Sequence, residues 1–127
     1  AIKLDQVGSI NGVTTGSDVV LATITNTAGD ITQTANGKIT TTGGGGLVLQ
    51  AQNGAIVLDQ ANSVSGSFAV TGTQNGDVTL RNTGTLNVGT AGSGPGIAFS
   101  GITIGGSKTL SLISDSGSIT QSSAVIA

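Results

Sequence analysis

The chain has 127 residues, 22 of them glycine, and its four Lys or Arg residues against six aspartates give a formal net charge of −2. Charged residues make up 8% of the sequence, against roughly 25% in an average soluble domain. The sequence contains no Cys or His, which excludes disulfides, thiolate chemistry and imidazole acid–base catalysis. So few basic residues also argue against nucleic-acid binding.

The apolar residues are mostly Val, Ile and Leu at alternate positions, which is the pattern of half-buried strands. No apolar face forms at the 3.6-residue spacing of a helix, so we expect no helices. In chain order the pattern predicts short strands at Ile2–Leu4, Ser9–Val13, Val19–Thr25, Asp30–Thr34, Lys38–Thr41, Leu47–Ala51, Ala55–Asp59, Ser67–Thr71, Asp77–Arg81, Thr85–Val88, Gly96–Phe99, Ile102–Ile104, Thr109–Ile113, Ser118–Gln121 and Ala124–Ile126.

One unit recurs: two alternating apolar residues, a polar turn ending in glycine, and a second alternating apolar pair. Its copies are LVLQAQNGAIVL from Leu47, VTLRNTGTLNV from Val78, LSLISDSGSIT from Leu110 and a fainter ATITNTAGDIT from Ala22. We align their closing glycines as equivalent positions, namely Gly29, Gly54, Gly84 and Gly117. A repeat of this kind is typical of a solenoid, in which each repeat builds one coil.

The sequence therefore predicts an all-β parallel β-solenoid of about five coils, with residues 1–127 forming a single segment of it. The alternative is an antiparallel β-sandwich, because Asn-Gly pairs, which favour hairpins, occur at Asn11, Asn36, Asn53 and Asn75. We favour the solenoid, since a sandwich has no reason to repeat one unit in the same order.

The solenoid interpretation predicts the direction of the side chains. Inward positions are expected to hold Val, Ile, Leu and Phe, so that Phe68 and Phe99 belong to the core. Outward positions are expected to hold Thr, Ser, Asn, Gln and Gly. Gly43–Gly46 and Gly92–Gly96 are interpreted as corners or bulging insertions.

The aspartates do not form a recognisable catalytic or metal-binding pattern. They occur singly, at Asp5, Asp18, Asp30, Asp59, Asp77 and Asp115, and we interpret them as solvated turn carboxylates. A contact between Asp59 and Asp77 across a coil is a minor alternative. We predict no catalytic residues, no cofactor and no metal site, and we expect that the protein is not an enzyme.

The two ends of the predicted solenoid lack a recognisable cap. An open solenoid leaves unpaired backbone groups at its ends, which attract further strands. We therefore expect adjacent coils or identical subunits to pack at both axial ends, so that the chain is a slice of a longer solenoid or a stacking filament subunit. No apolar run reaches the roughly 18 residues of a transmembrane helix, and no signal peptide is recognisable at Ala1.

The run NSVSGSFAVTGTQNGDVTLRNTGTLNVG from Asn62, followed by TIGGSKTLSLISDSGSITQSSAVIA from Thr103, resembles the repeats of large bacterial surface exoproteins. These are the filamentous-haemagglutinin-like and related autotransporter-type adhesins. The resemblance implies a right-handed parallel β-helix, export across the outer membrane and a role in adhesion, aggregation or biofilm. It transfers no binding residue to this chain.

Together these observations predict a structural segment of a secreted or cell-surface bacterial adhesin-type β-solenoid, which gives reach and rigidity. The alternative is a subunit of an extracellular filament that polymerises by end-to-end stacking. A carbohydrate-binding or polysaccharide-cleaving β-helix is a third hypothesis. The expected partners are neighbouring coils or subunits, with a host or matrix receptor or a glycan as a further possibility. The axial ends and the glycine-rich insertions are the expected functional surfaces.

Overall fold

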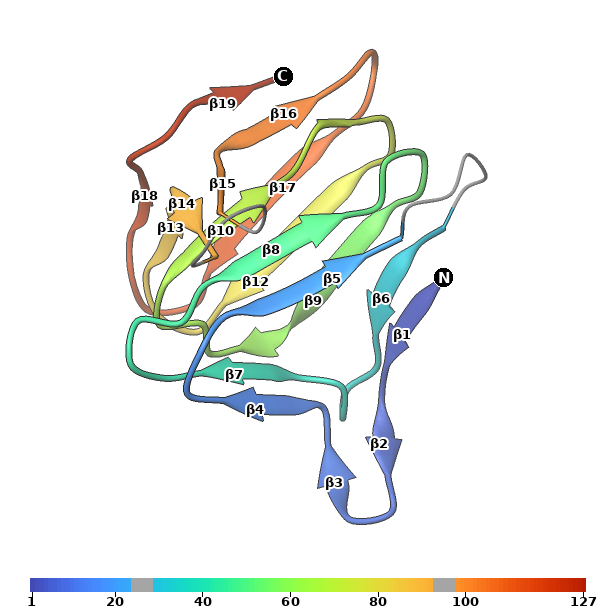
Figure 1. Ribbon diagram of the computed structural model, residues 1–127, viewed down its shortest axis with the longest axis vertical. Helices are drawn as coiled ribbons and strands as arrows, with labels where there is room; N and C mark the ends of the chain where they lie inside the picture. Colours follow the sequence, from blue (N-terminus) through green and yellow to red (C-terminus); the bar gives the residue numbers. More distant parts are fainter. Residues whose placement is uncertain (24–28, 93–97) are drawn as a thin grey trace.

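The computed structural model describes residues 1–23, 29–92 and 98–127, and every regular element in these ranges is a strand. Two five-stranded sheets dominate (Figure 1). Sheet 1 contains, in spatial order, β1 (Ile2–Leu4), β6 (Ile31–Gln33), β9 (Ile56–Asn62), β12 (Val78–Asn82) and β17 (Leu110–Ser114). Sheet 2 contains β5 (Val19–Ala22), β8 (Leu47–Gln50), β10 (Ser67–Val70), β13 (Leu86–Val88) and β18 (Ile119–Gln121).

The remaining strands are short and connect or flank these sheets. Sheet 3 contains β11 (Thr73–Gln74), β16 (Ile102–Ile104) and β19 (Val125–Ile126), all parallel. A parallel pair joins β4 (Val13–Thr15) to β7 (Ile39–Thr41). Two antiparallel pairs join β2 (Gln6–Val7) to β3 (Ile10–Asn11) and β14 (Thr90–Ala91) to β15 (Phe99–Ser100).

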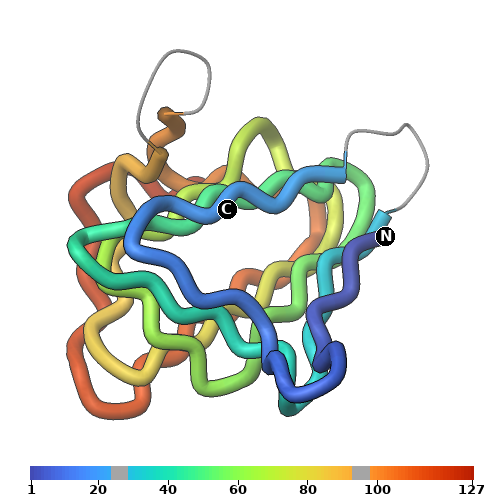
Figure 2. Tube along the Cα trace, turned by 60° about the horizontal axis from the view of Figure 1, so that its bottom comes forward, coloured from blue at the N-terminus to red at the C-terminus, as the bar shows by residue number. Residues whose placement is uncertain are grey.

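The chain crosses sheets 1 and 2 alternately, so each sheet grows by one strand at a time. We call the stretches β1–β5, β6–β8, β9–β11, β12–β16 and β17–β19 the first to fifth passes; each contributes one strand to each large sheet. Figure 2 shows the passes lying over one another, with the first in front. The strand neighbours in both sheets are thus never consecutive in sequence, and every pairing within them is parallel. The antiparallel sandwich is therefore not the arrangement of the large sheets.

Register keeps apolar residues in line from pass to pass. Ile2 pairs with Ile31, Ile31 with Ile56, Ile56 with Val78, and Val78 with Leu110. The three middle members of this ladder are fully buried, as the alternating pattern predicted. A similar ladder in sheet 2 joins Val19, Leu47, Phe68 and Val88. Each buried aliphatic side chain contributes about 1.5–3 kcal/mol, so these ladders hold the passes together.

The outer face of sheet 2 differs from the prediction that outward positions are polar. Val48 and Ala69 pair with each other and are fully buried, although their neighbours in sequence form the main core. Ala91 and Phe99, from the antiparallel pair β14–β15, pack against them and form a second small cluster. Phe99 is therefore not part of the main core, whereas Phe68 is. The prediction failed at Phe99 because alternation cannot tell an inner face from a covered outer face.

The repeat unit exists, but its copies do not occupy equivalent positions. The Leu47 copy runs from sheet 2 to sheet 1, whereas the Val78 and Leu110 copies run from sheet 1 to sheet 2. Consequently a Cβ on Gly54 would lie against Gly29, and one on Gly76 would lie against Gly54. Gly117 instead lies against Gly84 and Thr85 at a different corner. The alignment of all four glycines is wrong, because two corners of the chain require the same local sequence.

Most predicted strands are present, with changes at the turns. The predicted strand Ser9–Val13 is divided, because Gly12, at a φ of +65°, ends β3 and redirects the chain into β4. The short strands β2, β11 and β14 were not predicted. The predicted strands Val19–Thr25 and Gly96–Phe99 extend into residues 24–28 and 93–97, which lie outside the described residues.

Candidate functional site

At the C-terminal end of the molecule, the last strand of each parallel sheet has one edge that pairs with no other described strand. We use "C-terminal end face" for β17, β18 and β19, which each pair on one side only with strands of the described residues. Ile119 pairs in register with Leu86 and therefore faces the same way. Leu86 is fully buried, whereas Ile119 is 52% exposed. An inward-facing side chain is thus left uncovered on the last pass.

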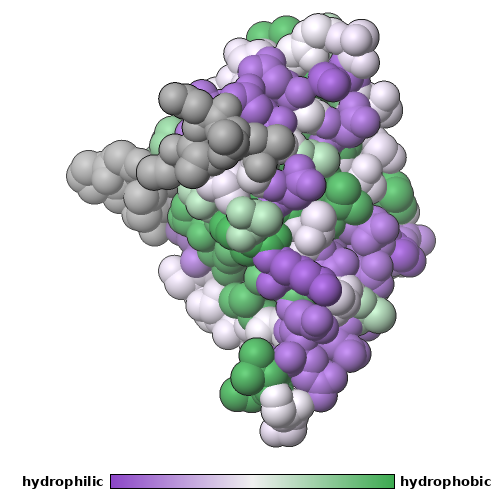
Figure 3. Space-filling model, turned by 90° about the vertical axis from the view of Figure 1, so that its right-hand side faces the viewer, coloured by the Kyte–Doolittle hydropathy of each residue, from purple (hydrophilic) through white to green (hydrophobic). Residues whose placement is uncertain are grey.

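The N-terminal end has the complementary arrangement. The "N-terminal end face" consists of β1, β4 and β5, whose apolar residues Ile2, Val13 and Leu21 pack on the core but remain only partly buried. Beside it projects the β2–β3 hairpin, in which Val7 is 80% and Ile10 70% exposed. Apolar surface is visible at the lower end of the molecule in Figure 3, where this hairpin lies. Both predicted axial ends therefore carry open strands and uncovered apolar groups.

Three aspartates link neighbouring passes through their carboxylates. Asp30 Oδ1 accepts the N–H of Ala55 at 2.8 Å, and Asp77 Oδ1 accepts that of Thr109 at 2.9 Å. Asp18 Oδ1 accepts the N–H of Gly46 at 2.7 Å. Each bond is charge-assisted and joins one pass to the next. The interpretation of these side chains as merely solvated was wrong. The available signal was that each stands directly before a strand-opening Val or Ile.

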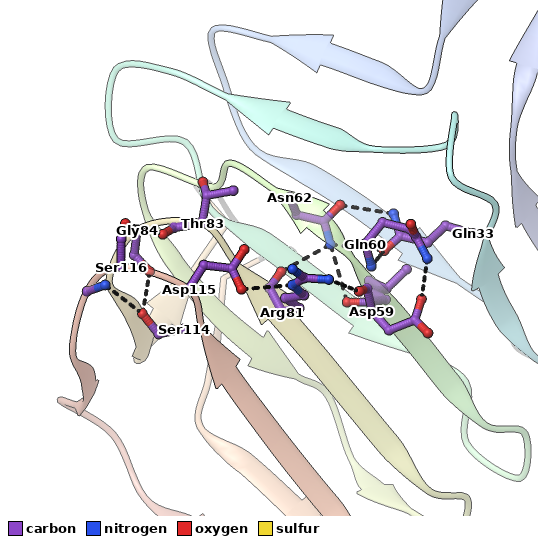
Figure 4. Close-up of polar contacts among 12 residues, drawn as sticks. Gln33, Asp59, Gln60, Asn62, Arg81, Thr83, Gly84, Ser114, Asp115 and Ser116 are labelled. Atoms are coloured by element: carbon purple, nitrogen blue, oxygen red, sulfur yellow. Dashed lines mark hydrogen bonds and ion pairs between the residues drawn. The ribbon is translucent and has the colours of Figure 1, made fainter.

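A line of buried amide side chains follows the corner after the sheet 1 strands. Asn62 is fully buried, and its Oδ1 accepts from Gln33 Nε2 and from the N–H of Ile39, both at 2.9 Å. Its Nδ2 donates to Gln33 Oε1 at 2.9 Å (Figure 4). Asn82, one pass later, accepts the N–H of Val64 at 2.8 Å and donates to its carbonyl at 3.0 Å. These amides satisfy backbone groups that the corner leaves without strand partners.

The outer surface of sheet 1 carries an ion pair between the fourth and fifth passes, and its arginine also bonds to the third. Arg81 Nε lies 2.9 Å from Asp115 Oδ1, and its Nη1 donates to the carbonyl of Asp59 at 3.2 Å (Figure 4). The hydrogen bond with Asp115 raises the pKa of Arg81 above its ordinary value. Asp59 does not meet Asp77: its carboxylate accepts from Gln60 instead. Within the described ranges, no three carboxylates gather in a way that could hold a metal ion.

A second titratable contact lies beside the first pass. Asp5 Oδ1 accepts the hydroxyl hydrogen of Thr34 at 2.5 Å, and this bond joins the first pass to the second. This hydrogen bond, together with one from the backbone of Gln6, lowers the pKa of Asp5 below 3.8. The charged carboxylate of Asp5 therefore stabilises the folded protein by accepting this hydrogen bond.

Gly92, the first residue of the predicted insertion Gly92–Gly96, lies beside the other glycine-rich segment, Gly43–Gly46. Gly43–Gly46 and Gly92 line the same hollow, together with residues of the first and third passes. The rest of the predicted insertion, residues 93–96, lies outside the described residues. No local pattern in the sequence indicated that Gly92 lies beside the Gly43–Gly46 run.

Comparison of the chain with protein-family models, with curated proteins and with solved structures found no match. Among the described residues there is no helix with the length and apolar character needed to span a membrane.

Proposed function

We propose that the five passes are coils of a right-handed parallel β-helix and that this β-helix is a structural segment. In this proposal the chain is a rigid, non-enzymatic spacer of a secreted or cell-surface bacterial adhesin-type protein. The observation that carries the proposal is the state of the two end faces. Both present parallel strand edges, and inward-facing residues such as Leu112 and Ile119 at one end and Ile2 at the other are only partly covered.

The physical reason is that a β-helix is stabilised by contacts between neighbouring coils. A terminal coil with one neighbour exposes apolar surface and unpaired backbone N–H and C=O groups, which is unfavourable. Covering an end with a further coil restores both the apolar burial and the strand pairing. The handedness is supported by the rule that crossovers between parallel strands of one sheet are right-handed.

Tandem fusion tests this function directly. Two copies joined head to tail by a short flexible linker are expected to unfold in one transition, at a higher denaturant midpoint than the single chain, because one pair of end faces becomes covered. In the matched control, Leu112→Lys and Ile119→Lys are introduced only at the junction, and the midpoint is expected to return to that of the single chain. Equal midpoints for the unmodified fusion and the control would contradict the proposal.

A second candidate function is a filament subunit that polymerises by end-to-end stacking. It is favoured by the fact that the two end faces are different surfaces, so a head-to-tail contact repeats without closing. Sedimentation of the single chain over a concentration series distinguishes the two functions. Open-ended growth, abolished by Ile119→Lys, supports the filament, whereas a sharp monomer boundary at all concentrations supports the covalent segment.

A further inference from the structure

A hollow of about 390 Å³ opens at the corner that leads into sheet 2. Four passes contribute to it: the first through Gly16–Asp18, the second through Gly43–Gly46, the third through Gly66 and Ser67, and the fourth through residues 90–92. The volume lies within the range of about 300–1,000 Å³ that is typical of small-molecule sites. It extends from the N-terminal end face, through the residues between β4 and β5, along the neighbouring passes.

Glycines explain why the backbones around the hollow lie close together and why no side chain fills it. A Cβ on Gly46 would lie 2.8 Å from the Ser67 carbonyl oxygen and 2.9 Å from Ala91 Cβ, so the backbones can stack closely only without side chains. Gly44 is different, because a Cβ there would meet nothing within 4 Å. The close approach thus brings the backbones of neighbouring passes together, whereas a side chain at Gly44 would enter open space.

The polar side chains at the rim are held in place by the fold. Asp18 Oδ1 accepts the Gly46 N–H, and among the described residues its other oxygen accepts no hydrogen bond. Ser67 Oγ accepts from Asn87 Nδ2 at 2.8 Å, which leaves its own hydrogen available. Thr90 Oγ1 shares one hydrogen with Ser100 Oγ at 2.6 Å and retains further capacity. The lining of the hollow thus includes one carboxylate residue and two hydroxyl residues, Asp18, Ser67 and Thr90.

The chemistry of the lining restricts the ligand. Among the described residues that line the hollow there is no Lys or Arg, so an acidic ligand would meet only the negative charge of Asp18. The same described residues include no large apolar side chain, so an apolar ligand would gain little from them. A neutral molecule with several hydroxyl groups suits a carboxylate acceptor flanked by hydroxyls, because its O–H groups can form charge-assisted hydrogen bonds.

We propose that this hollow binds a neutral sugar, with adjacent sugar hydroxyls donating to the Asp18 carboxylate and further hydrogen bonds to Ser67 and Thr90. This activity is independent of the structural role, since a spacer can fulfil that role with the hollow empty. Sugar binding in the hollow would give the protein a surface that contacts glycans.

Saturation-transfer NMR on the intact chain tests the proposal, with glucose, galactose, mannose and N-acetylglucosamine as neutral probes and N-acetylneuraminic acid as the acidic probe. Asp18→Asn keeps an oxygen that can accept the Gly46 N–H but removes the charge, and Gly44→Asn places a side chain that tolerates positive φ into the open space. The matched control is Asp77→Asn, which alters the equivalent carboxylate away from the hollow.

We expect at least one neutral sugar to bind the unmodified chain and Asp77→Asn equally, with binding weakened about tenfold or more by Asp18→Asn and abolished by Gly44→Asn. Circular dichroism of each variant verifies folding, so that a loss can be assigned to the hollow. Binding of none of the neutral sugars, preference for the acidic probe, or equal binding by Asp18→Asn would each overturn the proposal.

Discussion

Asn62 Oδ1 accepts the backbone N–H of Ile39 at 2.9 Å, although Ile39 lies in the preceding pass. Both residues are fully buried, so no water competes for this bond. Because Asn62 also exchanges hydrogen bonds with Gln33, one side chain satisfies several groups of the pass before it. The corner between the sheets is thus held by an amide network in addition to the strand pairing of β4 with β7.

Replacing Asn62 by Ala is expected to lower the free energy of unfolding by about 2–4 kcal/mol, because the Ile39 N–H and the Gln33 amide lose a buried partner. Urea denaturation followed by circular dichroism measures the change. Asn36→Ala is the control: Asn36 is exposed and donates one hydrogen bond to Gln6, so the expected change is below about 0.5 kcal/mol. Similar values for the two variants would show that the buried network does not stabilise the corner.

The two phenylalanines allow the inner core and the outer cluster to be compared with one substitution. Phe68→Ala is expected to cost about 3–5 kcal/mol, because Phe68 is fully buried between Leu47 and Val88. Phe99→Ala is expected to cost less, since Phe99 is only partly buried on the outer face of sheet 2. Thermal and urea unfolding of both variants decides the order; a larger loss at Phe99 would mean that the outer cluster dominates.

The sequence was informative wherever a local pattern has one structural meaning. Alternation at Leu47 and Leu49, or at Val78 and Leu80, identifies strands and their buried residues, because side chains of a strand point to opposite faces in turn. The parallel arrangement followed from the repeat itself. Four successive pairings in each large sheet agree with that prediction.

The remaining features depend on which pass a residue lies beside, and local sequence does not specify this. Gly54 and Gly84 close similar units but occupy different corners, because the number of residues between strands varies from pass to pass. The hollow shared by the Gly43–Gly46 run and Gly92 likewise depends on the register of whole passes. The burial of Val48 also depends on residues far away in the sequence, because Ala91 and Phe99 pack over it.

Corner glycines are expected to differ sharply in their tolerance of alanine. Gly76→Ala places a Cβ against the Gly54 carbonyl and should cost about 1–3 kcal/mol or more, since backbone must shift. Gly84→Ala meets nothing within 4 Å and should be neutral or stabilising by about 0.4–1 kcal/mol, through a less flexible unfolded chain. Differential scanning calorimetry measures both; destabilisation by Gly84→Ala comparable to that by Gly76→Ala would contradict the stacking of corners.

Stability should fall in acid partly through Asp5. The Thr34 hydroxyl lowers the pKa of Asp5 in the folded protein below its unfolded value of 3.8, so the charged form stabilises the fold above that pH. This stabilisation is lost as the pH falls through the folded pKa. Thr34→Val is therefore expected to unfold at a lower denaturant midpoint than the unmodified chain at neutral pH, with the difference vanishing in strong acid. Thr32→Val, in the strand β6 that ends just before Thr34, should show no such pH-dependent difference.

The ion pair of Arg81 and Asp115 should contribute far less than the buried amides, although it too joins neighbouring passes. The side chains are 38% and 30% exposed, so water and salt screen their attraction. Pairing therefore adds little stability compared with the two side chains separately hydrated. Arg81→Gln is expected to lower the unfolding midpoint much less than Asn62→Ala, and the loss caused by Arg81→Gln should shrink further as sodium chloride is added. Urea titrations of both variants at low and high salt make the comparison. A loss at Arg81 that equals the loss at Asn62 and is insensitive to salt would place the main link between passes on the outer surface of sheet 1.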